Sequence, residues 1–419
     1  MAPASQEFQV FAKPIGAICN LACHYCYYLK KEQLYQNDQS FIMPDDILEE
    51  YIIQHIAAST SQVINFSWHG GEPTLLGLEY FKKIVSLQRQ HQPPGRRITN
   101  GMQTNGTLID EKWCRFLAKE GFSVGLSLDG PEELHDYYRV AKGNKPTFRQ
   151  VMRGYELLRQ HRIFCDILCV VHARNAPHPS EVYRFFKQIK AQYVGFLPLV
   201  ERRPDMESGV CDRTVSAGAW GAFLCTIFDE WLLKDIGQVK VQIFEEATRR
   251  AFGQEQSLCI FRKTCGEIPV IEHNGDFFSC DHFVDGEHRL GNVRNTALVE
   301  VLESPAQQAF GEAKFAALPS FCRTCEVLTT CYGGCPKDRF IQTPDGQKGL
   351  NYLCAGYKRF FTHCRPFVDE LANLLRRSTE GVPPPQKQNT SAQNSVTTGR
   401  NAPCPCGSGK KFKNCCLGK

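Results

Sequence analysis

The placement of cysteines constrains this chain more than any other feature of its sequence. Most of its 21 cysteines fall into three groups: three within the first 26 residues, eight from Cys259 to Cys354, and four from Cys404 to Cys416. A chain of 419 residues is too long to be a small secreted scaffold held by disulfides. Its first residues also lack the basic and apolar regions of an export signal. We therefore expect a cytoplasmic protein whose grouped thiols bind metal.

Charge and composition exclude several classes of protein. The formal net charge of +5 is small for this length, so nucleic-acid binding is not expected to be the main task of the core. A hydrophobic fraction of 42% is enough for a buried core and excludes a disordered chain. No apolar run approaches the roughly 18 residues that a spanning helix needs, so we expect no membrane partner.

From Phe8 to about residue 200, extended apolar stretches alternate with amphipathic ones. This alternation predicts an α/β fold of repeated β–α units around a parallel sheet, with function at the carboxyl ends of the strands. The predicted strands are Val10–Lys13, Val63–Trp68, Arg97–Gln103, Ser123–Ser127, Phe164–Val171 and Tyr193–Pro198. The predicted helices are Pro44–Ser59, Leu78–Gln90, Asp110–Glu120, Phe148–His161 and Ser180–Lys190. Six strands fit a partial (β/α)6 barrel of the TIM type.

The pattern changes after about residue 235, which we take as the end of the barrel domain (1–235). Residues 236–378 form short segments broken by Gly, Cys and charged residues, closed by a predicted helix at Pro366–Arg377. In this domain metal is expected to replace part of the core. Residues 379–400 have the composition of a flexible linker, and residues 401–419 are too short to fold by burial alone.

The first cysteine group has the spacing C-x3-C-x2-C directly after a predicted strand and consists of Cys19, Cys23 and Cys26. A structural zinc site needs four ligands, and an ordinary ferredoxin loop also supplies four thiolates. Three thiolates therefore indicate an iron–sulfur cluster with one iron open to another ligand. The alternative is a zinc site completed by His24 or by a distant residue.

This loop resembles the signature of the radical S-adenosylmethionine (SAM) superfamily. In that family the three thiolates hold a [4Fe-4S] cluster whose open iron is chelated by SAM. Electron transfer then cleaves SAM to a 5′-deoxyadenosyl radical, which removes a hydrogen atom. The resemblance implies that Cys19, Cys23 and Cys26 are the cluster ligands and that Tyr25 packs near the adenine.

A pair of glycines follows a predicted strand in the segment His69-Gly70-Gly71-Glu72-Pro73. Paired glycines let the backbone approach a ligand closely, and Glu72 is able to accept a hydrogen bond from an ammonium group. The segment resembles the GGEP motif of the same family, which makes Gly70, Gly71 and Glu72 candidate SAM contacts. The alternative is an ordinary strand-to-helix turn.

Two further segments, beginning at Gln103 and at Ser127, also end predicted strands, where the ligand face of a β/α barrel lies. Gln103 is a candidate cofactor contact, Ser127 a candidate contact of the SAM methionyl moiety, and Arg139 a candidate partner of its carboxylate. The alternatives are common turns for the first two and a surface ion pair for Arg139.

The second group contains enough thiols for two four-ligand sites with no open position, and a pair of zinc ribbons remains an alternative. Its pattern resembles the SPASM domain of peptide-modifying radical SAM enzymes, in which auxiliary [4Fe-4S] clusters are fully cysteine-ligated. By that resemblance one cluster is held by Cys259, Cys265, Cys280 and Cys335. The other is held by Cys322, Cys325, Cys331 and Cys354.

Asp281 directly follows Cys280, and a carboxylate there is either a general base or an acceptor of local backbone N–H groups. The Cys280-Asp281 pair resembles the anaerobic sulfatase-maturating enzymes, in which the corresponding Asp deprotonates the substrate thiol or hydroxyl. The resemblance covers about residues 8–370.

This resemblance implies oxidation of a Cys or Ser of a sulfatase polypeptide to Cα-formylglycine without dioxygen. It also implies three [4Fe-4S] clusters, SAM and a low-potential electron donor. One alternative is another SPASM enzyme that forms thioether or carbon–carbon crosslinks in a peptide. The other is a non-catalytic metal-binding scaffold.

The third group lies in the tail and resembles a SEC-C motif, a small zinc-binding module. Four soft ligands in so short a segment suit one tetrahedral Zn²⁺, which would supply the folding energy that the segment lacks. The expected ligands are Cys404, Cys406, Cys415 and Cys416. With its lysines, the tail is interpreted either as a docking module for a protein or nucleic-acid partner, or as a solvated knob held by zinc.

Overall fold

The computed structural model describes residues 3–35, 40–206 and 209–380, together with residues 401, 411 and 414. The described residues up to Ala372 belong to one compact unit, and those from Asn373 onward belong to a second. Among the described helices, none combines the length and apolar character that crossing a bilayer requires. The four tail cysteines and residues 381–400 of the predicted linker lie outside the described residues.

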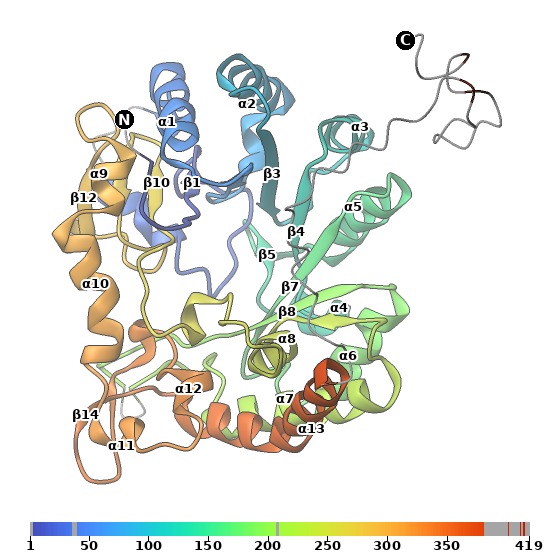
Figure 1. Cartoon of the computed structure of the whole chain (residues 1–419), viewed down its shortest axis with the longest axis vertical. Helices are drawn as coiled ribbons and strands as arrows, with labels where there is room; N and C mark the ends of the chain where they lie inside the picture. Colours follow the sequence, from blue (N-terminus) through green and yellow to red (C-terminus); the bar gives the residue numbers. More distant parts are fainter. Residues whose placement is uncertain are drawn as a thin grey trace. The chain divides into compact units, whose positions relative to one another are not determined.

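Within the described residues, ten strands form one sheet in the order β12-β11-β10-β1-β2-β3-β4-β7-β8-β9 (Figure 1). Neighbouring strands from β10 to β9 in that order are parallel, whereas β11 and β12 pair in the antiparallel sense. The strands are β1 Phe11–Lys13, β2 Val63–Trp68, β3 Arg97–Thr104, β4 Ser123–Ser127, β7 Cys165–Val171, β8 Tyr193–Pro198, β9 Lys240–Val241, β10 Val270–Glu272, β11 Asp276–Phe278 and β12 Arg289–Asn292. The six predicted strands match β1, β2, β3, β4, β7 and β8 to within one residue at each end. The predicted α/β class with a mainly parallel sheet is confirmed.

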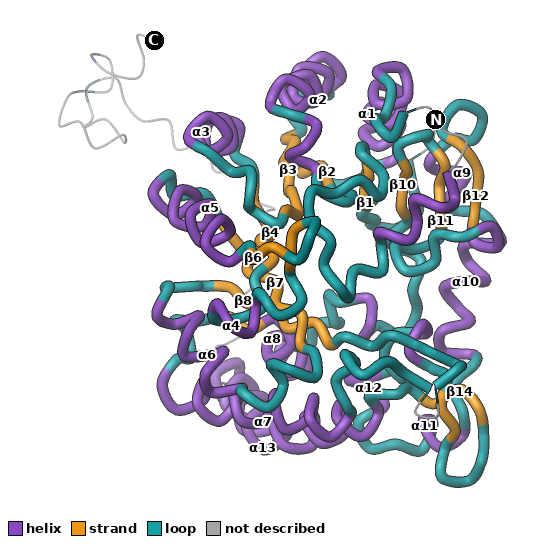
Figure 2. Tube along the Cα trace, turned by 180° about the vertical axis from the view of Figure 1, so that it is seen from behind, coloured by secondary structure: helices purple, strands orange, loops and turns teal. Residues whose placement is uncertain are grey.

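Helices α1, α2, α3 and α5 lie along the outer side of the parallel strands (Figures 1 and 2). The α-helices are α1 Asp45–Ala58, α2 Leu78–His91, α3 Glu111–Glu120, α4 Glu132–His135, α5 Phe148–Gln160, α6 Pro179–Gln188, α7 Ala217–Lys234, α8 Gln242–Thr248, α9 Leu298–Leu302, α10 Pro305–Ala316, α11 Ser320–Arg323, α12 Leu328–Cys331 and α13 Cys354–Glu380. Two short hairpins pair β5 Val140–Ala141 with β6 Lys145–Pro146, and β13 Ile341–Gln342 with β14 Lys348–Leu350. The five predicted barrel helices correspond to α1, α2, α3, α5 and α6.

Helix α3 illustrates how the local sequence fixes these elements. The Asp110 side chain accepts a hydrogen bond from the Trp113 backbone N–H at 2.9 Å and so caps the helix N-terminus. Gly121 ends the helix in the left-handed region, with φ 68°, which a residue with a side chain adopts at a cost. Trp113 and Leu117 are buried on the face that meets the sheet. The helix thus joins β3 to β4 and keeps their carboxyl ends on the same edge.

Strands β10, β11 and β12 were not predicted from the sequence. Each is only three or four residues long. Strands β10 and β11, unlike β1, are followed by another strand rather than by a helix, so no β–α alternation marks them. Their buried side chains, among them Val270, Ile271 and Phe277, attach the segment to the edge of β1. The cysteine-rich region therefore begins within the same sheet as the barrel, and the boundary near residue 235 stays a prediction.

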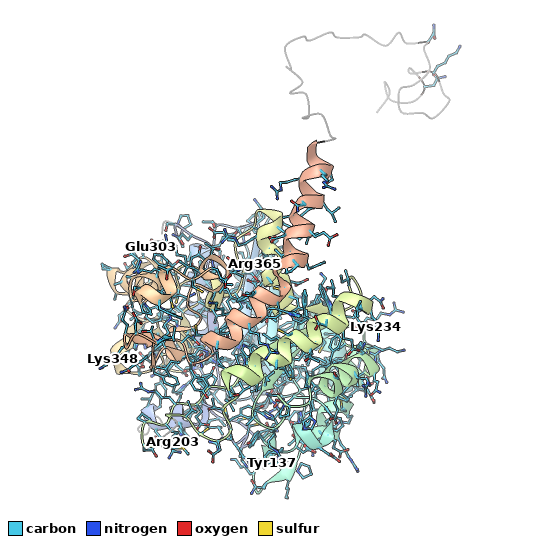
Figure 3. The ribbon with its side chains drawn as sticks, turned by 90° about the horizontal axis from the view of Figure 1, so that it is seen from below. Tyr137, Arg203, Lys234, Glu303, Lys348 and Arg365 are labelled. Atoms are coloured by element: carbon cyan, nitrogen blue, oxygen red, sulfur yellow. The ribbon has the colours of Figure 1, made fainter. Side chains whose placement is uncertain are left out.

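Helix α13 begins at Cys354 rather than at Pro366, where the sequence placed its start. Pro366 lies inside the helix although it lacks an N–H donor, because aromatic residues on the preceding turns hold the helix against α7. A Cβ on Gly221 of α7 would lie 2.9 Å from the Gly356 Cα of α13, so two glycines allow the helices to approach closely. Figure 3 shows α13, through Arg365, running beside α7, which ends at Lys234.

Candidate active site

The first three thiols lie on the loop that follows β1. Burial raises the pKa of Cys19 to about 12 and that of Cys23 to about 11, and interaction with Cys26 adds to both shifts. The Leu21 backbone N–H donates to the Cys19 Sγ atom at 3.3 Å. Thiols with such pKa values are protonated at neutral pH, so they become ligands only when a metal centre displaces their protons. The exposed His24 instead forms a hydrogen bond of 3.0 Å with Asn144.

The glycine pair after β2 packs directly against this cysteine loop. The Gly71 N–H donates to the Gly16 carbonyl at 2.7 Å, and the Glu72 N–H donates to the Ile18 carbonyl at 2.9 Å. A Cβ on Gly71 would lie only 2.1 Å from the Ile18 oxygen, and Gly70 has a φ of 137°. The close approach that these glycines permit is therefore made to the protein's own loop, next to Cys19.

Glu72 is fully buried and joins the ends of β2 and β3. Its carboxylate accepts hydrogen bonds from Thr74 N–H at 3.0 Å, Thr74 Oγ1 at 2.5 Å, Thr104 Oγ1 at 2.7 Å and Asn105 N–H at 2.7 Å. Burial raises the pKa of Glu72, and these donors oppose the rise. The Asn105 side chain extends to within 3.8 Å of the Cys19 Sγ atom. Glu72 thus orders the backbone behind the first cysteine group, and its contact with an ammonium group stays a prediction.

Asp129 is a central residue that the sequence did not single out. It is completely buried and accepts hydrogen bonds from the Tyr25 hydroxyl, the Arg139 Nε atom at 3.1 Å and the Val170 N–H at 2.9 Å. Burial would raise its pKa, but the Arg139 guanidinium holds the pKa below the usual range. The surface ion pair considered for Arg139 is wrong, since its side chain is only 10% exposed. One buried carboxylate therefore positions both Tyr25 and Arg139.

Gln103 and Ser127 end the neighbouring strands β3 and β4. The Gln103 Nε2 atom donates to the Ser127 Oγ atom at 3.1 Å. A Cβ on Gly125 would lie 2.1 Å from the Gln103 Oε1 atom, so a glycine on β4 makes room for this side chain. Both residues are partly buried at the strand ends where the sequence predicted ligand contacts.

Asp281 follows β11 and forms an ion pair with Lys13, at the end of β1, with 2.6 Å between Nζ and Oδ1. The Tyr27 hydroxyl donates to the other carboxylate oxygen. Burial would raise the pKa of Asp281, but the Lys13 ammonium, His282 and Tyr27 hold it well below its usual value. In the described part of the chain, no backbone N–H donates to this carboxylate. Its side chain is 16% exposed, and Tyr27 is the residue after Cys26.

Lys13 was missed by the sequence reading, although a lysine at the carboxyl end of a barrel strand is itself a signal of function. Its side chain is 4% exposed and its Nζ atom lies 4.0 Å from the centre of the Tyr28 ring. The Tyr28 hydroxyl in turn donates to the buried Glu272. A charged network therefore surrounds the candidate base.

Electrostatic interactions divide the eight thiols of the second group into two sets of four. Burial raises the pKa of Cys265, Cys280 and Cys335, and interaction with Cys259 adds to each rise. Burial also raises the pKa of Cys322, Cys331 and Cys354, with a further contribution from Cys325, and these four thiols line one cavity with Leu328 and Leu350. The assignment of each set to one cluster stays a prediction. Within the described residues, no three Cys, His, Asp or Glu side chains have the arrangement of a site for one metal ion.

Comparison with known families assigns three segments. Residues 14–186 match the radical SAM superfamily, residues 259–326 match SPASM, an iron–sulfur cluster-binding domain, and residues 400–418 match the SEC-C motif.

The chain is similar to known proteins over most of its length. It is 43% identical over 387 residues to a serine-type anaerobic sulfatase-maturating enzyme of Bacteroides thetaiotaomicron, which covers 89% of this chain and 93% of the relative. It is 33% identical over 371 residues to a cysteine-type anaerobic sulfatase-maturating enzyme of Clostridium perfringens, which covers 87% and 98%.

Two solved structures are similar to most of the chain. Native anSMEcpe with bound AdoMet (SAM) has a TM-score of 0.78 and 33% identity, covering 87% of this chain and 99% of that chain. The same protein with AdoMet and the Cp18Cys peptide has a TM-score of 0.79 and 32% identity, covering 88% and 100%.

Proposed function

Because the chain belongs to the anaerobic sulfatase-maturating enzymes of the radical SAM superfamily, we propose that it oxidises a Cys or Ser side chain of a sulfatase polypeptide to Cα-formylglycine. The reaction uses no dioxygen. The observation that carries the proposal is the position of Asp281. This buried carboxylate contacts Tyr27, which follows Cys26, and it follows Cys280 in the chain, so it lies beside both the first thiol group and a set of the second.

The proposed cofactors are SAM and three [4Fe-4S] clusters. When bound, they supply a radical that removes a hydrogen atom from the substrate Cβ and a centre that accepts one electron. The thiols present fit this set. Cys19, Cys23 and Cys26 would provide three ligands and leave one iron free to bind SAM, and the two later sets would provide four ligands each. A low-potential electron donor is the proposed partner. All these thiols must be reduced, which suits the cytoplasm.

The remaining requirement of the oxidation is the removal of one proton from the substrate thiol or hydroxyl. We assign this proton to Asp281. Lys13 and Tyr27 hold its two oxygens in place, and the positive charge of Lys13 favours the ionised carboxylate. Loss of one hydrogen atom, one proton and one electron converts CH₂–SH to a thioaldehyde, which water hydrolyses, or CH₂–OH directly to an aldehyde.

Tyr25, Arg139, Gln103, Ser127 and the Gly70–Glu72 segment are the proposed surroundings of SAM. Asp129 fixes the first two, and the hydrogen bond between Gln103 and Ser127 links the next two. The glycine pair and Glu72 hold the cysteine loop itself. These contacts orient the cofactor side of the site before the substrate peptide enters.

The proposed domains are the barrel at 1–235, the SPASM domain at 236–378, a linker at 379–400 and the zinc-binding motif at 401–419. Cys404, Cys406, Cys415 and Cys416 are the proposed ligands of one Zn²⁺, and the tail is the proposed docking module for a protein partner. The match of residues 400–418 to the SEC-C motif supports this part of the proposal.

The test is an anaerobic assay with the iron-reconstituted protein, SAM, a strong reductant and a peptide bearing Cys-x-Pro-x-Arg, alongside the same peptide with Ser in place of Cys. We expect 5′-deoxyadenosine together with an aldehyde at the target residue, trapped with a hydrazine and located by mass spectrometry. Deoxyadenosine without an aldehyde on either peptide would move the substrate to another peptide class. The absence of both products, from protein with its full iron content, would contradict the proposed function.

A further inference from the structure

Two cationic side chains, Lys314 and Arg339, lie in the cysteine-rich region without an acidic partner, the first buried and the second partly buried. Lys314 on α10 is 1% exposed, and its Nζ atom donates to the carbonyls of Cys259, at 2.5 Å, and Arg262. Arg339 lies between Cys335 and β13, and it donates to the carbonyls of Gly333, at 3.0 Å, and of Lys314. Over the residues that the structure describes, neither cation lies within ion-pair distance of a carboxylate. A buried charge without an opposite charge is strongly unfavourable, so the counter-charge has to come from elsewhere.

The cysteine thiols of this region become negatively charged when a metal centre displaces their protons. The pKa of Lys314 is lowered by burial and raised by interaction with Cys265, Cys259 and Cys335, all of one set. The pKa of Arg339 is likewise lowered by burial, and the thiols that oppose this belong to both sets: Cys265, Cys322, Cys331 and Cys335. The hydrogen bond of Lys314 to the Cys259 carbonyl places its charge beside one thiol set. The hydrogen bonds of Arg339 to the carbonyls of residues 332–334 place its charge beside the segment between Cys331 and Cys335, which belong to different sets.

The fold brings Lys314 to this position through Gly311, one helical turn earlier on α10. A Cβ on Gly311 would lie 2.4 Å from the Cys265 carbonyl oxygen, and the Cys265 N–H donates to the Gly311 carbonyl at 3.2 Å. Residues three apart on a helix share a face, so this close approach directs Lys314 toward the same thiols. A position as enclosed as this is costly for lysine, whose charge usually remains in water.

We propose that Lys314 and Arg339 are the counter-charges of the two auxiliary clusters and set how readily these clusters accept the electron of the substrate. The inference rests on the proposed function only in requiring those clusters. A [4Fe-4S]²⁺ core with four thiolates carries a net charge of −2, which becomes −3 when it takes one electron from the substrate radical. A fixed cation nearby stabilises the more negative state and so raises the reduction potential. Both residues are thus positioning residues that act through the clusters.

The experiment uses the full chain with Cys19, Cys23 and Cys26 changed to Ala, so that only the auxiliary clusters remain. In this background Lys314→Met removes the buried charge and keeps an unbranched side chain. Lys263→Met is the matched control. This substitution removes the same charge from the same region, but the Lys263 side chain is exposed. The reduction midpoint is measured by a redox titration followed by electron paramagnetic resonance.

We expect Lys314→Met to lower the equilibrium constant for one-electron reduction about tenfold, which is about 59 mV for a one-electron couple, and Lys263→Met to leave it unchanged. An unchanged potential in Lys314→Met protein with full iron content would overturn the proposal. A role in packing alone would not move the potential of retained clusters.

Arg339 provides a second comparison in case Lys314→Met does not retain its clusters. Arg339→Gln and Arg339→Lys both lose the guanidinium that donates to the carbonyls of residues 332–334, but only the Gln variant loses the charge. We expect a lower potential in the Gln variant than in the Lys variant, and equal potentials would overturn the proposal. The aldehyde assay on the unmodified chain is independent, so failure of the proposed function and failure of this inference are distinguishable.

Discussion

Lys13 and Asp281, which lie far apart in the sequence, form an ion pair with 2.6 Å between Nζ and Oδ1. They meet because β1 pairs in parallel with β10, and β10 pairs with β11, which brings the segment after β11 close to β1. The candidate base is therefore held by a residue that precedes the first cysteine group. Within the described residues, neither side chain forms an ion pair with a residue close to it in the sequence.

Asp281→Asn separates proton removal from radical formation. The amide keeps the shape of the side chain but cannot accept the substrate proton, so we expect aldehyde formation to fall about 100-fold or more while 5′-deoxyadenosine still forms. The exposed Glu287→Gln is the control, because it removes one negative charge from the same segment. Aldehyde formation by Asp281→Asn at the rate of the parent would remove this residue from the reaction.

Asp129→Asn tests the buried carboxylate that positions Tyr25 and Arg139. Removing the charge leaves the Arg139 guanidinium buried without its partner, which costs about 3 kcal/mol of folding stability. We expect a higher KM for SAM together with a lower thermal midpoint, since the proposed SAM-contacting side chains lose their common anchor. A variant with lower stability but an unchanged KM for SAM would confine Asp129 to a structural role.

Gly71→Ala tests the contact between the glycine pair and the cysteine loop. The added methyl group would lie 2.1 Å from the Ile18 oxygen, so the loop that carries Cys19 has to move. We expect the reconstituted protein to lose about four irons per chain and its SAM cleavage. Gly218→Ala on α7 is the control, since a Cβ there meets nothing within 4 Å. Full iron content in Gly71→Ala would show that the loop tolerates the displacement.

Cys331→Ala tests the second auxiliary set by iron content. With three clusters the protein is expected to hold about twelve irons, and this substitution should remove about four of them while SAM cleavage persists. Cys364→Ala, at a buried cysteine of α13 that we assign to no cluster, should leave the iron content unchanged. Equal iron content in the two variants would contradict the proposed ligand set.

His55 makes the stability of the barrel depend on pH. Burial between Tyr51 and Phe66 lowers its pKa to about 3, against about 6.5 in an unfolded chain. The folded state therefore binds this proton less readily than the unfolded state. The contribution of His55 to stability is full above pH 6.5 and falls by about 1.4 kcal/mol for each pH unit between 6.5 and 3.

The measurement compares thermal midpoints at pH 7 and pH 5.5 under anaerobic conditions. We expect the parent protein to lose more stability than His55→Gln over this interval, because the variant has no group that titrates at this position. Other buried histidines contribute equally to both proteins, so the difference between the two reports His55. An identical pH dependence would contradict the shifted pKa.

The sequence predicted the barrel well because each of its strands combines a continuous apolar run with a following amphipathic helix. Trp68 and Ile64 on β2, for example, are buried as their pattern required. Strand β10 was missed because another short strand follows it instead of an amphipathic helix, and the start of α13 was missed because a proline normally begins a helix rather than continues one.

The candidate site was predicted unevenly for a related reason. The spacing of the thiols identifies them as candidate ligands. The roles of Lys13, Asp129 and Lys314 are recognised only from partners that are distant in the sequence. Arg339 and Lys314 carry no local motif at all. Long-range charge pairing is a property of the folded chain, so a single sequence does not reveal it.

The parallel pairing of β1 with β10 also affects how this chain is made. During synthesis from the amino end, β1 can pair with β2 early, but its other edge stays open until Glu272 has left the ribosome. An open strand edge invites pairing with other chains. The nascent protein thus carries an exposed edge next to its first three cysteines until β10 is made, and this interval is when protection by a chaperone matters most.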